Sequence, residues 1–177
     1  MSGSAGAADA EGSAQTEARR LLDSLTRAGW MSALAESCTG GLVSAALTSV
    51  PGSSARFWGS VVSYANEAKE KVLSVPREIL ERHGAVSAET VRAMALGVLA
   101  LSGADVAAAV SGIAGPGGGT PDKPVGTVWI GLASRAGVVR EVRLDLRGDR
   151  DRIRTESALR TLKELRSLVE EGIMLSP

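Results

Sequence analysis

Apolar residues follow two alternating patterns along this chain, helical spacing and short continuous runs. Leu21, Leu22 and Leu25 fall on one face of a predicted helix, and Gly29 supplies its left-handed stop. The run 106–110 is apolar without a break, as in a strand that is covered on both faces. Strands are predicted over 30–35, 57–64, 106–110, 127–133 and 138–146, and helices over 17–28, 42–48, 66–73, 76–84, from Ser87 and from Asp149.

The alternation of helices and strands predicts a single three-layer α/β/α domain around a mainly parallel, mixed sheet. The last two strands are close enough in sequence to form an antiparallel hairpin across 135–137. Residues 1–16 are mostly Ala, Gly and Ser, and we expect a disordered tail there, followed by the domain over 17–172. A chain of 177 residues can bury an ordinary core without disulfides.

Composition narrows the class of partner. The 20 basic and 20 acidic residues cancel, so no positive field favours nucleic acid, and a small-molecule ligand is expected. The sequence shows neither a signal peptide nor an apolar stretch long enough to span a membrane, so we expect a soluble, cytoplasmic protein. Because the chain has one histidine and one cysteine, no zinc site is expected, nor any other required metal or cofactor.

Three polar clusters follow predicted strands, where ligands bind in open α/β sheets. The first cluster is Ser37-Cys38-Thr39-Gly40-Gly41, and it precedes a helix whose free N–H groups would suit an anion. Two interpretations stay open at this point. Either Ser37 or Cys38 is a nucleophile, or the turn is a helix cap whose hydroxyls satisfy the first N–H groups of the helix.

The second cluster runs from Tyr64 to Lys69. Lys69 lies one turn into a helix, so it either points back toward the strand end or belongs to a solvated helix face. Histidine chemistry would depend on His83 alone, which sits at a helix end where a cation favours the dipole. If the protein is an acyl-transfer enzyme, a lysine whose pKa is lowered by burial is the best remaining general base, and Lys69 and Ser37 then form a natural pair.

The third cluster is a glycine- and proline-rich loop over 112–124, too long to be a mere connection, and we interpret it as a binding loop. It lacks the Gly-Lys-Ser/Thr of a nucleoside-triphosphate loop and the third glycine of a dinucleotide loop. Four arginines flank the start of the last helix, where they either grip a phosphate or serve only as surface solubilisers: Arg147, Arg150, Arg152 and Arg154.

Four motifs recur here in a characteristic order. They are Ala35-Glu36-Ser37-Cys38-Thr39-Gly40-Gly41, Tyr64-Ala65-Asn66-Glu67-Ala68-Lys69, Ser111-Gly112-Ile113-Ala114-Gly115-Pro116 with Pro124-Val125-Gly126-Thr127-Val128, and Gly148-Asp149-Arg150. Together they resemble the CinA carboxy-terminal domain family over 17–169. The resemblance implies a stand-alone form, because the tail before Glu17 is too short to supply the additional amino-terminal domain that many relatives carry. A serine that often follows the tyrosine is missing, and we expect a modest effect on activity.

The resemblance implies an activity and a set of site residues. The family is known for deamidating nicotinamide mononucleotide, which yields nicotinate mononucleotide and ammonia. By resemblance, Ser37 is the nucleophile, Lys69 is its base, and Tyr64 positions or polarises one of them. Backbone N–H groups of Thr39, Gly40 or Gly41 are the expected oxyanion hole. The expected substrate contacts are Glu36, Asn66, Gly112, Ala114, Gly115, Gly117, Thr127, Arg147 and Arg150, with Arg147 or Arg150 taking the 5′-phosphate.

Functions of other classes stay open from the sequence. A catalytically idle module that binds a pyridine nucleotide would keep the pocket without turnover, and Cys38 could replace Ser37 as the nucleophile. A DNA-related role, suggested by the family's historical link to competence, lacks a basic stripe that would bind a groove. The aromatic residues Trp30, Phe57, Trp58 and Trp129 leave room for a self-association face, and a homodimer is expected.

Overall fold

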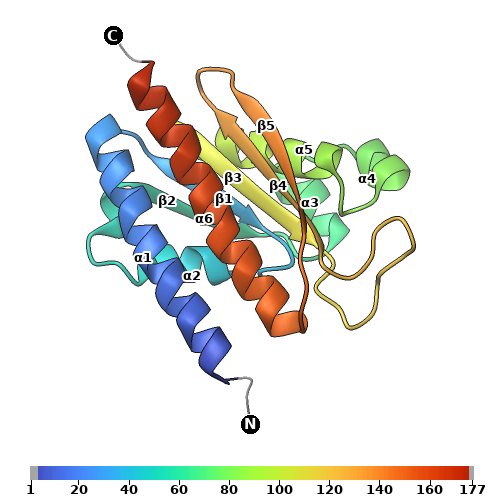
Figure 1. The fold of residues 1–177 in the computed structure, drawn as a ribbon. Helices are drawn as coiled ribbons and strands as arrows, with labels where there is room; N and C mark the ends of the chain where they lie inside the picture. The colour runs from blue at the N-terminus through green and yellow to red at the C-terminus, as the bar shows by residue number, and fades with distance from the viewer. Residues whose placement is uncertain (1–3, 176–177) are drawn as a thin grey trace.

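The computed structural model describes residues 4–175, and the side chains of residues 14–175. Its sheet has the strand order β2-β1-β3-β4-β5 (Figure 1). The strands are β1 (Ser32–Glu36), β2 (Phe57–Val62), β3 (Val106–Gly112), β4 (Thr127–Ser134) and β5 (Val139–Asp145). The helices are α1 (Ser4–Ala28), α2 (Leu42–Thr48), α3 (Asn66–Leu73), α4 (Arg77–His83), α5 (Ala88–Ser102) and α6 (Arg150–Met174), with a short 3-10 helix over Ser53–Ala55.

The sheet is parallel in one half and antiparallel in the other. β1 pairs in parallel with β2 and β3, whereas β4 runs antiparallel to both β3 and β5. The predicted hairpin of β4 and β5 is therefore confirmed. The expectation of a mainly parallel sheet is corrected to an even division of the pairings, because no helix separates β3 from β4 and the chain returns antiparallel without one.

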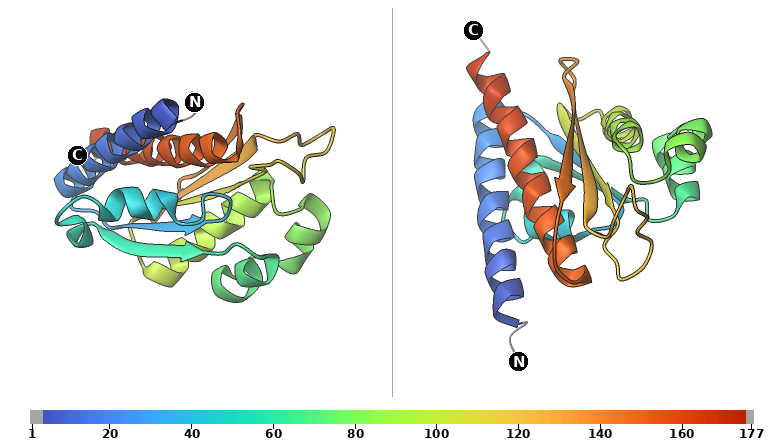
Figure 2. Two further views of the ribbon diagram at one scale, coloured as in Figure 1. Left: turned by 90° about the horizontal axis from the view of Figure 1, so that it is seen from below. Right: turned by 45° about the vertical axis from the view of Figure 1, so that its right-hand side comes forward.

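Helices cover both faces of the sheet, which confirms the three-layer domain. α1, α2 and α6 lie on one face, and α3, α4 and α5 lie on the other (Figure 2). Alternate residues of β1 serve the two cores: Leu34 belongs to the α1 and α6 side, and Ala33 and Ala35 to the α5 side. Small residues let α5 approach closely, since a Cβ added to Gly131 would lie 2.3 Å from the carbonyl oxygen of Val91.

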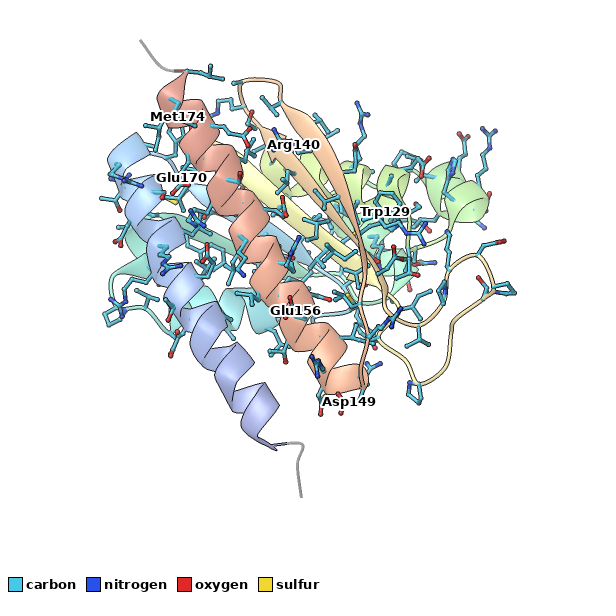
Figure 3. All side chains as sticks on the ribbon, in the orientation of Figure 1. Trp129, Arg140, Asp149, Glu156, Glu170 and Met174 are labelled. Atoms are coloured by element: carbon cyan, nitrogen blue, oxygen red, sulfur yellow. The ribbon has the colours of Figure 1, made fainter. Side chains whose placement is uncertain are left out.

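Most helices begin and end close to the residues that the sequence predicts. The predicted bounds of α2 and α3 are confirmed. Ser87 caps α5 by accepting from the N–H of Thr90, and Asp149, at the amino end of α6 in Figure 3, caps that helix by accepting from the N–H of Arg152. Strands β1 and β2 are shifted or shortened by one or two residues at their ends, where pairing rather than composition sets the limit.

Helix α1 begins at Ser4 rather than at residue 17, which corrects the predicted start of the first helix. Residues 1–3 of the expected tail, and the side chains of residues 4–13, lie outside the described part of the chain. Ala14 is already buried in the core, because the apolar stripe of α1 packs on α6. The two helices are also joined through the carboxylate of Glu170, labelled in Figure 3, which accepts from the Ser24 hydroxyl at 3.0 Å.

The aromatic residues do not form one continuous surface. Phe57 is buried in the core, Trp30 packs against the same core, and Trp58 is about half exposed on the edge strand β2. Trp129 is packed against the α5 side of the sheet. The expected homodimer stays a prediction. Over residues 4–175, none of the helices combines the length and apolarity that a membrane crossing requires.

Candidate active site

Ser37 lies where β1, β2 and β3 reach their carboxyl ends. Its N–H donates to the carbonyl oxygen of Val110 on β3 at 2.9 Å, and the N–H of Ser63, just after β2, donates to the carbonyl oxygen of Glu36 at 2.8 Å. The ends of these three strands are therefore tied to one another by backbone hydrogen bonds. Ser37 itself is 8% exposed, so its hydroxyl is largely shielded from solvent.

Lys69 on α3 points back toward this strand end, and its side chain is completely buried. Its Nζ lies 3.2 Å from Ser37 Oγ and donates to the carbonyl oxygens of Ser63 at 2.8 Å and Tyr64 at 3.4 Å. Burial lowers the pKa of Lys69 from its ordinary value, because desolvation disfavours the ammonium form. The alternative of a solvated helix face is thereby excluded for Lys69.

Tyr64 acts through two different parts of the residue. Its carbonyl oxygen accepts from Lys69, whereas its hydroxyl accepts from Arg150 Nη2 at 3.0 Å, and the residue is 62% exposed. Tyr64 therefore contacts Lys69 through its carbonyl oxygen and Arg150 through its hydroxyl, and its expected role of positioning or polarising Ser37 or Lys69 stays a prediction. The second Arg150 nitrogen, Nη1, donates to the carbonyl oxygen of Gly115 at 2.8 Å.

Glu36 is fully buried, and its carboxylate lies inside the turn formed by residues 37–41, the Ser37 turn. Its carboxylate accepts from the N–H groups of Gly41, Val43 and Ser44 at 3.0, 3.1 and 2.9 Å, and from the hydroxyls of Thr39 and Ser44 at 2.7 and 2.8 Å. The first N–H groups of α2 are thus satisfied by an internal carboxylate. The expectations that Glu36 touches substrate and that α2 offers its N-terminus to an anion are both corrected.

Two of the three predicted oxyanion donors already form hydrogen bonds within the turn. Gly40 N–H donates to the carbonyl oxygen of Ser37 at 3.0 Å, and Gly41 N–H donates to Glu36, so these two candidates are already engaged. The N–H groups of Cys38 and Thr39 face the Cys38 sulfur, where they oppose the rise of its pKa. Neither of these two N–H groups donates to an oxygen acceptor among the described residues, so Thr39 remains among the expected donors, and Cys38, which lines the cavity, joins it.

Cys38 is a poor nucleophile in this structure. Burial, with a smaller contribution from the Glu36 carboxylate, raises the pKa of the thiol to about 12, although the Arg154 cation opposes the rise. A thiolate is the reactive form of cysteine, and it is disfavoured here at neutral pH. Burial of the thiol therefore disfavours Cys38 as the rival nucleophile that the sequence left open.

A cavity of about 200 Å³ opens beside Ser37 and Lys69. It is lined by Ser37, Cys38, Tyr64, Lys69, Ala85, Val86, Ser111, Gly112, Ala114 and Arg150. Residues 85 and 86 lie between α4 and α5 and were not anticipated as part of the site. The Ser111 hydroxyl holds this segment against the end of β3 by donating to the carbonyl oxygen of Ala85 at 2.7 Å.

The family model of the CinA C-terminal domain matches residues 14–169. The chain belongs to this family. It is 57% identical over 134 residues to a CinA-like protein of Geobacter metallireducens, with 76% of this chain and 32% of the relative covered. The chain thus spans about a third of the length of such CinA-like relatives.

Shorter members of the CinA family are matched over most of their length. A relative from Enterobacter agglomerans, named nicotinamide-nucleotide amidohydrolase PncC, is 50% identical over 135 residues, with 76% of this chain and 82% of the relative covered. The crystal structure of competence/damage inducible protein CihA from Agrobacterium tumefaciens superposes with a TM-score of 0.86 at 42% identity, covering 88% of this chain and 95% of that one.

Several residues expected at the substrate site of this family lie away from the cavity. Asn66 and Gly117 are exposed, and so is Arg147, which precedes α6. Thr127 is buried, and it lines a separate hollow with Trp129 rather than the wall beside Ser37. Gly112, Ala114 and Arg150 do line the cavity, and Gly115 contributes its carbonyl oxygen to Arg150.

Arg154 contacts the Ser37 turn and does not line the cavity. Its Nε donates to the carbonyl oxygen of Cys38 at 3.1 Å and its Nη2 to that of Thr39 at 3.0 Å. Spacing gave a signal for this, because positions 150 and 154 share one face of a helix. Among the described side chains, His, Cys, Asp and Glu form no group of three that could hold a metal ion.

Proposed function

We propose that this protein hydrolyses the carboxamide of nicotinamide mononucleotide, releasing ammonia and nicotinate mononucleotide. The reaction named for the Enterobacter agglomerans relative supports the choice of substrate. The observation that carries the proposal is the contact between Ser37 Oγ and a completely buried Lys69 at 3.2 Å. A serine hydroxyl becomes a useful nucleophile when a base within hydrogen-bond distance takes its proton.

The surroundings of Lys69 favour a neutral amine. A neutral amine has two N–H groups and one lone pair, and two carbonyl oxygens, those of Ser63 and Tyr64, accept from Nζ. The lone pair is then left for the Ser37 hydroxyl. No carboxylate among the described residues forms a salt bridge with Lys69, and burial lowers its pKa, so the neutral base is more available than in an exposed lysine.

The proposed reaction has two steps. Ser37 Oγ attacks the carboxamide carbon while Lys69 takes the hydroxyl proton, and the C–N bond then breaks as Lys69 returns the proton to departing ammonia. The nicotinoyl ester on Ser37 is next attacked by water, whose proton passes to Lys69 and then to Ser37 Oγ. Nicotinate mononucleotide leaves, and both side chains regain their starting protonation.

Two further groups complete the proposed site. The N–H groups of Cys38 and Thr39 stabilise the negative oxygen of the tetrahedral intermediate, since the neighbouring amides are engaged elsewhere. Arg150, which lines the cavity, binds the 5′-phosphate with donors that its contacts to Tyr64 and Gly115 leave over. Arg147 lies outside the cavity, which makes Arg150 the better of the two phosphate candidates.

Ammonia release from nicotinamide mononucleotide in chelator-treated buffer tests the proposal. We expect turnover by the unmodified protein and loss of turnover in Ser37→Ala and Lys69→Met. Lys71→Met, on the same helix but exposed and paired with Glu67, is the matched lysine control and should keep full activity. Absence of ammonia from the unmodified protein would favour the catalytically idle binding module instead.

A further inference from the structure

Arg154 extends from the second turn of α6 onto the Ser37 turn, and its side chain is 27% exposed. The fork of its guanidinium matches two consecutive carbonyl groups, with Nε on that of Cys38 and Nη2 on that of Thr39. Contact with the turn is close, because a Cβ added to Gly40 would lie 3.3 Å from Nη2. Arg154 does not line the cavity, whereas Cys38, whose carbonyl oxygen it holds, does.

The two contacts fix the orientation of two peptide planes. In a trans peptide unit the C=O and N–H groups point in opposite directions. Since Arg154 holds the Cys38 carbonyl on its own side, the Thr39 N–H of the same unit points away from α6. In the next peptide unit the Thr39 carbonyl oxygen also accepts from Arg154. The Gly40 N–H of that unit donates to the carbonyl oxygen of Ser37.

The charge of Arg154 acts on the same peptide unit. A cation bonded to a carbonyl oxygen draws electron density from the amide and makes its N–H a stronger donor, an effect that is larger where water is excluded. The field of Arg154 reaches the pocket wall, because it lowers the pKa of Cys38 against the effects of burial and of Glu36.

We propose that Arg154 is a positioning residue that orients and polarises the Cys38–Thr39 peptide, whose N–H stabilises the oxyanion formed when Ser37 attacks. The proposal rests on the amidase function proposed above. Arg154 acts through the backbone and contributes to the transition state, not to substrate affinity. Lysine cannot replace it fully, since one ammonium group lacks the planar fork that reaches both carbonyls.

Steady-state kinetics of Arg154→Met and Arg154→Lys test the role. We expect kcat to fall about 10- to 100-fold in Arg154→Met with KM within about twofold, and Arg154→Lys to recover part of kcat. Arg160→Met, which removes an arginine paired with Glu164 on the same helix, is the control and should match the unmodified protein. A kcat within about twofold of the unmodified protein, or a rise in KM alone, would overturn the proposal.

A serine-directed fluorophosphonate separates this inference from the proposed function. Ser37 Oγ attacks phosphorus, fluoride leaves, Lys69 takes the proton, and the phosphoryl oxygen gains charge as the carboxamide oxygen would. We expect labelling of Ser37 to be at least about tenfold slower in Arg154→Met. If Arg154→Met loses its near-ultraviolet circular dichroism, and with it the native fold, the labelling rate of Arg154→Lys is compared with that of the unmodified protein instead. Equal labelling rates overturn the role of Arg154. Labelling without ammonia release would instead refute the deamidase alone.

Discussion

The Ser37 turn and the glycine-rich loop between β3 and β4 lie at the same end of the sheet, yet they are built in opposite ways. In the turn, the buried Glu36 carboxylate accepts from backbone N–H groups, and Arg154 on α6 donates to backbone carbonyl oxygens. In the loop, residues 116–122 are exposed. Its backbone hydrogen bonds are few; among them, Gly126 N–H donates to the carbonyl oxygen of Ile113 at 2.8 Å, and Thr120 N–H donates to that of Lys123 at 2.9 Å.

The difference separates two requirements of an enzyme site. A nucleophile and its oxyanion donors need positions fixed to a fraction of an ångström, and buried charged groups with several hydrogen bonds supply that rigidity. A loop that encloses substrate needs room to admit it, which a glycine-rich, exposed chain provides. Changes in the turn should therefore affect chemistry and stability, and changes at the loop tip should affect neither strongly.

The largest effect on activity is expected from Lys69→Met. Loss of a general base typically lowers kcat about 10²- to 10⁴-fold. In the unmodified protein kcat/KM should rise with pH as Lys69 loses its proton, and should level off below the ordinary lysine pKa of about 10.4. A pH profile of ammonia release checks both points. A flat profile for the unmodified protein would show that Lys69 is not the base.

The lowered pKa of Lys69 also predicts how stability varies with pH. Between the folded-state pKa and about 10.4, the unfolded chain binds more protons at this residue, so Lys69 makes the folded state more stable as pH rises. The free energy of unfolding of the unmodified protein minus that of Lys69→Met should therefore increase toward pH 10. Urea titrations at several pH values measure it.

Glu36→Gln should produce the largest loss of stability. One carboxylate oxygen becomes an NH₂ group that faces N–H and hydroxyl donors, so at least two buried donors lose their acceptor. At about 1–3 kcal/mol for each unsatisfied group, two such donors predict a fall in the unfolding free energy of about 2–6 kcal/mol in urea denaturation. Glu67→Gln, an exposed glutamate paired with Lys71, is the control and should change stability by less than about 1 kcal/mol.

Much of this site was predictable from the sequence, and the parts that were not depend on tertiary contacts. Lys69 follows a strand end by one helical turn, which was enough to pair it with Ser37. Alternation along β1 places Glu36 on the same face as Leu34, the face that α2 covers, so a signal for its burial existed. Residues 85 and 86 carry no such signal, because α4 and α5 bring them to the cavity only in the folded chain.

Arg150→Met should weaken binding of the proposed substrate and spare the chemistry. Loss of a charge-assisted contact to the 5′-phosphate predicts a KM about 10- to 100-fold higher for nicotinamide mononucleotide, with kcat nearly unchanged. Nicotinamide riboside, which lacks the phosphate, should show no such increase. Arg147→Met provides the comparison, since Arg147 is exposed outside the cavity. A larger effect at Arg147 than at Arg150 would reverse the assignment.

The smallest effect is expected in the loop, and two glycines make the comparison with the turn direct. Gly117 has no atom within 4 Å of an added Cβ and no left-handed backbone, so Gly117→Ala should leave the unfolding free energy within about 1 kcal/mol and activity unchanged. Gly40 has φ +60° and lies against Arg154. Gly40→Ala should cost about 1–2 kcal/mol for the left-handed conformation and should also lower kcat, because an added methyl group displaces the guanidinium. Equal behaviour of the two variants in urea denaturation and ammonia release would show that the turn is no more constrained than the loop.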